Sequence, residues 1–181
     1  MSNIISLHDG DDRIDRWLRM SNGLTAVFVQ ILALAGSSLA KTTREKELVI
    51  WLAEKDQNVV GNGTVGFSIS EMPWTRDGFT GEKEFLLKVV EAARNKERWK
   101  VLDYRPNEMI FDCLDKFRDL IKAFEATEID INNYHDWKNS SPETEAPSGF
   151  PKCPKHQVLL HWHGCTICND EQSPLDGRLI S

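Results

Sequence analysis

Three of the four cysteines in this 181-residue chain lie close together near its C-terminus. Cys153 and His156 are separated by two residues, and so are Cys165 and Cys168. Zinc binds thiolates and imidazoles in a tetrahedron, and a two-residue gap lets a tight turn present both side chains to one ion. Gly164 before the second pair permits the backbone to curl as such a turn requires. The spacing therefore predicts a Zn²⁺ site formed by Cys153, His156, Cys165 and Cys168.

Two further histidines compete for the fourth ligand position. The residues between the two pairs read QVLLHWH. On a strand, Val158, Leu160 and Trp162 would face one side, while Gln157, Leu159, His161 and His163 would face the other. That arrangement would leave two histidines near the ion. His161 or His163 is therefore an alternative to His156.

The complete segment CPKHQVLLHWHGCTIC resembles the CPxH…GCxxC zinc modules of the zinc-ribbon or treble-clef type found in many bacterial and phage proteins. The resemblance covers residues 151–170 and implies a metal knuckle. Four protein ligands close the coordination sphere, whereas a catalytic zinc keeps an open position. We therefore expect a structural ion, which would contribute on the order of 10 kcal/mol to ordering this short segment.

Other patterns that could carry chemistry have a simpler interpretation. Cys113 lies on the apolar stripe of a predicted helix, where a small buried hydrophobic residue is expected. Gly61, Gly63 and Gly66 spell GxGxxG, but a helix precedes them and a strand follows, the reverse of a dinucleotide-binding fingerprint. They predict a turn. No set of acid, base and nucleophile emerges, so the chain is predicted not to be an enzyme.

Composition and charge indicate a cytoplasmic protein. The chain has 22 basic and 28 acidic residues, and its net charge of −6 disfavours generic binding to phosphate backbones. Thiols mixed with imidazoles are typical of a reducing compartment, and acidic residues near Met1 stand where a signal peptide would be basic. The apolar run over residues 24–35 is shorter than the roughly 20 residues that span a membrane. It predicts the central helix of a soluble bundle.

The hydrophobic periodicity predicts a predominantly helical α+β fold of about five helices, a small two-stranded element and a C-terminal zinc knuckle. Apolar residues at helical spacing predict helices over residues 11–20, 24–35, 42–56, 81–98 and 106–124. Thr42 and Glu45 have the spacing of a capping box. Alternation over residues 65–69 predicts a strand, and residues 99–104 predict a second strand or an extended connection.

The composition changes after Trp137. Residues 139–152 are rich in Ser, Pro, Glu and Gly and bury too little apolar surface to offset chain entropy, which is typical of a linker. We therefore expect a body over residues 1–138, a linker over 139–152 and a zinc-binding appendage over 153–181.

The charge pattern of the body predicts a protein partner. Residues 103–138 contain nine acidic and five basic residues, so they carry negative potential. Exposed aromatic residues such as Trp74 and Trp137 would add anchors to this surface. The blocks GFSISEMPW, EKEFLLKVV and WKVLDYRPNE resemble small bacterial immunity partners of secreted toxins, which implies a non-enzymatic inhibitor that occludes a basic toxin.

An alternative is a nucleic-acid-associated or regulatory protein that uses the zinc module as a reader. Only Lys152 and Lys155 supply positive charge near the module, against Asp170 and Glu171. This balance makes nucleic acid the less favoured partner. The sequence leaves the oligomeric state open.

Overall fold

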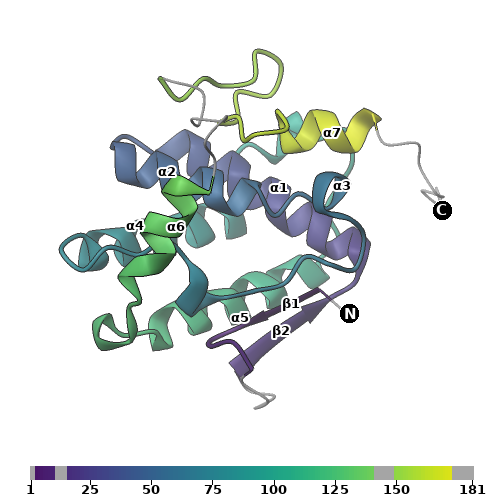
Figure 1. Cartoon of the computed structure of the whole chain (residues 1–181). Helices are drawn as coiled ribbons and strands as arrows, with labels where there is room; N and C mark the ends of the chain where they lie inside the picture. Colours follow the sequence, from purple (N-terminus) through teal and green to yellow (C-terminus); the bar gives the residue numbers. More distant parts are fainter. Residues whose placement is uncertain (1–2, 11–15, 141–148, 173–181) are drawn as a thin grey trace.

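The computed structural model describes residues 3–10, 16–140 and 149–172 of the chain. Within these ranges the fold is α+β, with seven α-helices and a three-stranded sheet (Figure 1). The helices are α1 Asn22–Leu39, α2 Thr43–Ala53, α3 Gln57–Val60, α4 Phe79–Arg94, α5 Met109–Ala123, α6 Ile131–Asn139 and α7 Thr166–Gln172. The strands are β1 Asn3–Ser6, β2 Trp17–Met20 and β3 Phe67–Ser68. Short 3-10 helices are η2 Ile69–Glu71, η3 Trp99–Val101 and η4 Ala126–Glu128.

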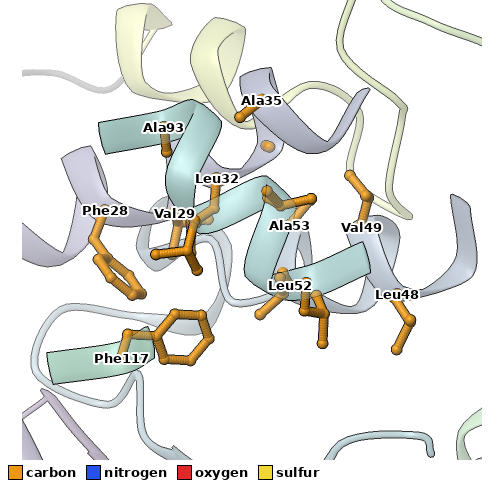
Figure 2. Packing of buried hydrophobic residues seen from close by; sticks show 14 of the residues in the cluster. Phe28, Val29, Leu32, Ala35, Leu48, Val49, Leu52, Ala53, Ala93 and Phe117 are labelled. Carbon is orange, nitrogen blue, oxygen red and sulfur yellow. The ribbon is translucent and has the colours of Figure 1, made fainter. Parts of the chain in front are cut away.

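Helix α1 forms the centre of the fold, as its uniformly apolar sequence predicts. It contacts α2, α4, α5 and α7. It is also the one helix of the described residues that is long and apolar enough to cross a membrane, and 61% of it is buried here. Figure 2 shows Phe28 of α1 and Phe117 of α5 pointing toward each other, with ring centroids 5.2 Å apart in an edge-to-face pair. Because α1 is buried on most sides, its sequence has no polar face.

The predicted capping box starts α2. The Glu45 backbone N–H donates to Thr42 Oγ1 (3.2 Å), and the Thr42 backbone N–H donates to Glu45 Oε2 (2.9 Å). Two backbone donors at the helix start are thereby satisfied. This local signal sets the sharp turn between α1 and α2, so that the two helices pack against each other.

The sheet is larger than predicted, and the helix predicted over residues 11–20 is wrong for residues 17–20. Residues 17–20 form β2, which pairs antiparallel with β1, while β3 pairs with β1 in parallel. Leu18 and Met20 are buried while Arg19 between them is exposed, which is the period of a strand. Residues 11–15 lie outside the described ranges.

The first strand is held by polar contacts as well as by pairing. The buried Asn3 side chain donates to Asn22 Oδ1 (3.0 Å) and to Gln57 Oε1 (2.8 Å), and it accepts from the Val65 backbone N–H (3.1 Å). These bonds connect β1 to α1, to α3 and to the segment just before β3. In the strand order β2-β1-β3, β1 is the middle strand of the sheet.

The predicted turn after α3 is confirmed, whereas the strand predicted after α4 is not. Gly61 and Gly63 have φ angles of 103° and 75° and form the predicted turn, after α3 and before β3. Of the strand predicted over residues 65–69, Phe67–Ser68 is a strand. Of the second strand or extended connection predicted over residues 99–104, Trp99–Val101 is a 3-10 helix, so the strand is wrong, and Leu102 after it is extended. Positive φ angles at Lys96 and Arg98 turn the chain sharply before it.

Candidate metal centre

The four predicted ligand side chains converge on one point. His156 Nδ1 lies 3.8 Å from Cys153 Sγ, 3.6 Å from Cys165 Sγ and 3.3 Å from Cys168 Sγ. The sulfurs of Cys153 and Cys168 are 3.7 Å apart, and all four donor atoms lie within 4.8 Å of one another. A tetrahedral ion with bonds of about 2.3 Å to sulfur and about 2.0 Å to nitrogen would separate its ligands by about 3.8 Å (S to S) and about 3.5 Å (S to N). The cluster therefore fits one tetrahedral metal ion.

The first ligand pair is presented by a tight turn. The Cys153 carbonyl accepts from the Gln157 backbone N–H (2.7 Å), and the Cys153 N–H donates to the Val158 carbonyl (2.8 Å). Gln157 adopts a φ of 55°, which closes the turn. The His156 backbone N–H lies 3.4 Å from Cys153 Sγ and favours the thiolate form of that sulfur. A two-residue gap thus brings both donor atoms to the same side.

The second ligand pair sits at the start of α7. Gly164 has a φ of 96°, and its backbone exchanges hydrogen bonds with His161 at 2.9 and 3.0 Å. A residue with a Cβ is strained at that φ, so glycine suits this turn. Cys165 lies immediately before α7, and Cys168 lies in its first turn. The helix therefore fixes the spacing of these two thiols.

Burial and a neighbouring carboxylate complete the site. Cys153, His156 and Cys165 are 4%, 1% and 4% exposed. His156 Nε2 lies 3.2 Å from Glu171 Oε1, which orients the ring so that Nδ1 faces the sulfurs. Burial raises the pKa of the Cys165 thiol to about 12. A divalent ion reverses that effect, because it stabilises the thiolate directly.

The two alternative histidines lie outside the cluster. His161 is buried, but its Nδ1 accepts from the His163 backbone N–H (3.4 Å) and its Nε2 lies 3.3 Å from Asp56 Oδ2. His163 is exposed. The predicted alternation of faces is wrong, because Val158 and Leu159 are both fully buried and only isolated bridges form there.

Polar contacts from the body hold the knuckle, here defined as residues 151–172. Ser37 accepts from Lys152 Nζ at its carbonyl (2.7 Å) and from the Leu159 backbone N–H at its hydroxyl (2.9 Å). Asp56 accepts from Asn169 Nδ2 (2.9 Å). The knuckle is thereby docked on the C-terminal end of α1 and the start of α3.

The third anchor is Arg98, which follows α4. Its guanidinium donates to the carbonyls of His156 (2.6 Å) and Gln157 (3.0 Å). Sequence reasoning missed Ser37, Asp56 and Arg98. A single polar residue far from the knuckle carries no local signal of such a contact. Of the linker predicted over residues 139–152, residues 141–148 lie outside the described ranges, and Asn139 ends α6.

The aromatic anchors predicted for a partner surface are wrong. Trp74 is 1% exposed, and its indole N–H donates to the Ile69 carbonyl (2.7 Å) while its ring stacks on Phe124. Trp137 is half-buried and donates to Glu54 Oε2 (2.9 Å). Both indoles serve internal packing, because each N–H finds an acceptor inside the fold.

Cys113 lies apart from the metal cluster. It is buried on α5, where burial raises the pKa of its thiol. The neutral thiol is a poor nucleophile, so the packing role predicted for Cys113 agrees with its surroundings.

Comparison of the chain with protein-family models, with curated proteins and with solved structures gives no match. The site and the surface around it are therefore the basis on which a function can be argued.

Proposed function

We propose that this chain is a non-enzymatic binding protein whose knuckle holds a structural Zn²⁺ ion. The observation that carries the metal assignment is the mutual spacing of three sulfurs and His156 Nδ1. Three thiolates and one imidazole are a common structural zinc set, and thiolates select zinc over magnesium or calcium. The set fills all four positions and leaves none for a substrate. A reducing compartment such as the cytoplasm would keep the thiols available.

Metal analysis of the purified chain tests the zinc assignment. We expect one zinc per chain in the parent and loss of that zinc in Cys168→Ser. Cys113→Ala is the matched control, because it removes a thiol outside the cluster and should retain the metal. A metal-free parent, or equal zinc in both variants, would contradict the assignment.

The partner we propose is a basic protein, bound through an acidic surface formed by the exposed carboxylates of Glu125, Glu128, Asp130 and Asp136. Glu125 and Asp130 precede η4 and α6, Asp136 lies in α6, and Glu128 ends η4 with its Oε1 2.9 Å from His8 Nε2. Ile131 among them is 43% exposed and offers an apolar contact. An acidic rim around a small apolar centre suits electrostatically steered association with a cationic protein. An immunity-type inhibitor that occludes a basic toxin would need such an acidic surface.

Helix α6 is fixed firmly enough to present that surface. Lys138 Nζ lies 2.8 Å from Glu47 Oε1, and the Asn133 side chain donates to the Ser70 carbonyl (2.7 Å). A preformed surface avoids the cost of ordering a loop on binding. Trp137 adds a third attachment through Glu54.

The nucleic-acid alternative at the knuckle has less support. Lys152 Nζ donates to the Ser37 carbonyl, and Lys155 Nζ lies 2.6 Å from Glu171 Oε2. Both cations counted for that alternative are therefore engaged within the chain. Little uncompensated positive charge remains there for phosphates.

Affinity purification from a native lysate, followed by binding kinetics with the recovered partner, tests the proposal. We expect a basic protein whose activity the chain inhibits, and a lower association rate for Asp136→Lys. Glu84→Lys is the matched control, because Glu84 is also an exposed helical carboxylate but lies on α4. An acidic partner, or equal effects of the two reversals, would contradict the acidic surface as the binding site.

A further inference from the structure

A second feature of the molecule is a cavity of about 260 Å³ between the segment that follows α4 and the start of α5. Three aromatic and three cationic side chains line it: Trp99, Tyr104, Phe111, Lys96, Lys100 and Arg105. Its lining residues belong neither to the metal cluster nor to the acidic surface.

The wall of the cavity is flat and aromatic. The rings of Trp99 and Phe111 stack with centroids 5.7 Å apart and an interplanar angle of 16°. Lys96 Nζ lies 5.7 Å from the Phe111 centroid, whereas Arg94 beside it is paired with Asp115 and does not line the cavity. Aromatic rings with cations beside them form the surface on which nucleobases stack.

The three cations that line the cavity are not balanced by carboxylates among the described residues. Within residues 3–10, 16–140 and 149–172, no carboxylate lies at ion-pair distance from Lys96, Lys100 or Arg105. Glu108 is the acidic residue among the described lining side chains, so the lining carries a net positive charge. A positive lining in a chain of net charge −6 is a local feature that favours an anion.

The backbone beside the cavity is fixed by contacts within the chain. Lys96 has a φ of 62° where it closes the C-terminus of α4, with its N–H donating to the Ala93 carbonyl (3.0 Å) and the Glu97 N–H donating to the Ala92 carbonyl (2.9 Å). The Arg98 guanidinium donates to the two knuckle carbonyls, and Glu97 Oε1 accepts from the Ser38 hydroxyl (3.0 Å). The cations on this segment therefore start from a fixed backbone.

We propose that this cavity binds a nucleotide, with its base against the Trp99–Phe111 wall and its phosphate paired with Lys96, Lys100 and Arg105. A simple anion would leave the aromatic wall unused, and an apolar ligand would leave three cations without a partner. A base that carries a phosphate satisfies both. The nucleotide is either free or the exposed nucleotide of a single strand, since both offer the same groups.

The test is a titration of the zinc-loaded full chain with adenosine monophosphate, followed by NMR of the tryptophan indole N–H groups. The Trp99 indole N–H is buried and has no acceptor among the described residues, so its resonance reports on the wall. We expect this resonance to shift. We also expect an affinity at least about tenfold above that for inorganic phosphate, because the stacked base adds contacts that phosphate lacks.

Charge variants locate the phosphate. The Lys96→Gln/Lys100→Gln double variant should weaken nucleotide binding by about tenfold or more, because it removes charge-assisted contacts. The matched control is Lys41→Gln/Lys88→Gln, which makes the same charge change at exposed lysines elsewhere. It should leave the affinity unchanged. Circular dichroism establishes that both variants are folded.

An oligoadenylate strand distinguishes the two sources. Tighter binding of the strand supports a nucleic-acid end as the ligand, and tighter binding of the mononucleotide supports a free nucleotide. The proposal is overturned if phosphate binds as well as the nucleotide, if neither binds, if an acidic peptide binds more tightly, or if the control variant loses as much affinity.

Discussion

Glu54 is a half-buried carboxyl group beside Trp137 of the body and Trp162 of the knuckle. Burial raises the pKa of Glu54 above its ordinary value, and the hydrogen bond from Trp137 offsets only part of that effect. The folded chain therefore binds this proton more tightly than the unfolded chain. The contribution of Glu54 to the free energy of unfolding is then largest below the ordinary carboxyl pKa, and it is lost as the pH rises through the raised pKa.

Glu54→Gln tests this effect. The amide oxygen can still accept from Trp137, but the side chain never ionises. We expect the variant to gain stability relative to the parent as the pH increases from about 4 to about 8. Urea unfolding at both ends of that range measures the difference. Glu84→Gln, at an exposed position on α4, is the control, and a parallel change in both variants would contradict the prediction.

At the scale of single residues, the sequence predicts what depends on near neighbours. Cys153, His156, Cys165 and Cys168 could be identified because a two-residue gap fixes the geometry of each pair. The prediction that Trp74 is exposed is wrong because its ring stacks on Phe124, which is fifty positions away. Nothing in the residues beside Trp74 indicates that contact.

At the scale of elements, α1 and α2 approach each other closely at Gly36. A Cβ added there would lie 2.6 Å from Val49 Cγ2 and 3.1 Å from Val49 Cγ1, so α1 and α2 would have to separate. Figure 2 shows Val49 on α2 and Ala35, the neighbour of Gly36, on α1. Small residues at a crossing let two helices approach closely, and overfilling such a contact destabilises the core.

Gly36→Ala should therefore lower the free energy of unfolding by about 1–3 kcal/mol. Gly23→Ala in the same helix is the control, because a Cβ there meets no atom within 4 Å. It should raise the stability by about 0.4–1 kcal/mol, because alanine loses less backbone entropy in a helix. Denaturant unfolding measures both, and equal effects would contradict the close contact.

The elements differ in how far their sequences predict them. Helices α1, α2, α4 and α5 follow long hydrophobic patterns or a local cap, which tertiary contacts reinforce. Strands β1 and β2 have four residues each, too few for the period of two to stand out. The conformation of β1 and β2 is set by the strands with which they pair. Their own residues therefore do not distinguish a strand from a helix.

At the scale of the whole molecule, the metal site and the body are coupled through Ser37 of α1. The knuckle covers the end of α1 and accepts contacts from Arg98. Loss of the metal should therefore weaken more than the knuckle, because the free energy of metal binding also orders the surface that docks on α1.

Chelation of the metal should lower the thermal unfolding midpoint and accelerate amide exchange at Cys153, Leu159 and Leu160. These amides donate to Val158, Ser37 and Pro151 respectively. The amides within α5 should keep their protection, because the core around Phe117 does not depend on the knuckle. Uniform acceleration, or none, would contradict this coupling. Hydrogen exchange read by mass spectrometry separates these outcomes.

The strand order β2-β1-β3 has a consequence for how the chain matures. β1 precedes both of its pairing partners in the chain, and one of them is β3, Phe67–Ser68. One edge of β1 therefore stays unpaired until about sixty more residues have been made. An open edge is the surface on which nascent chains associate wrongly. Pairing of this edge can therefore be completed only after residue 68 has emerged from the ribosome.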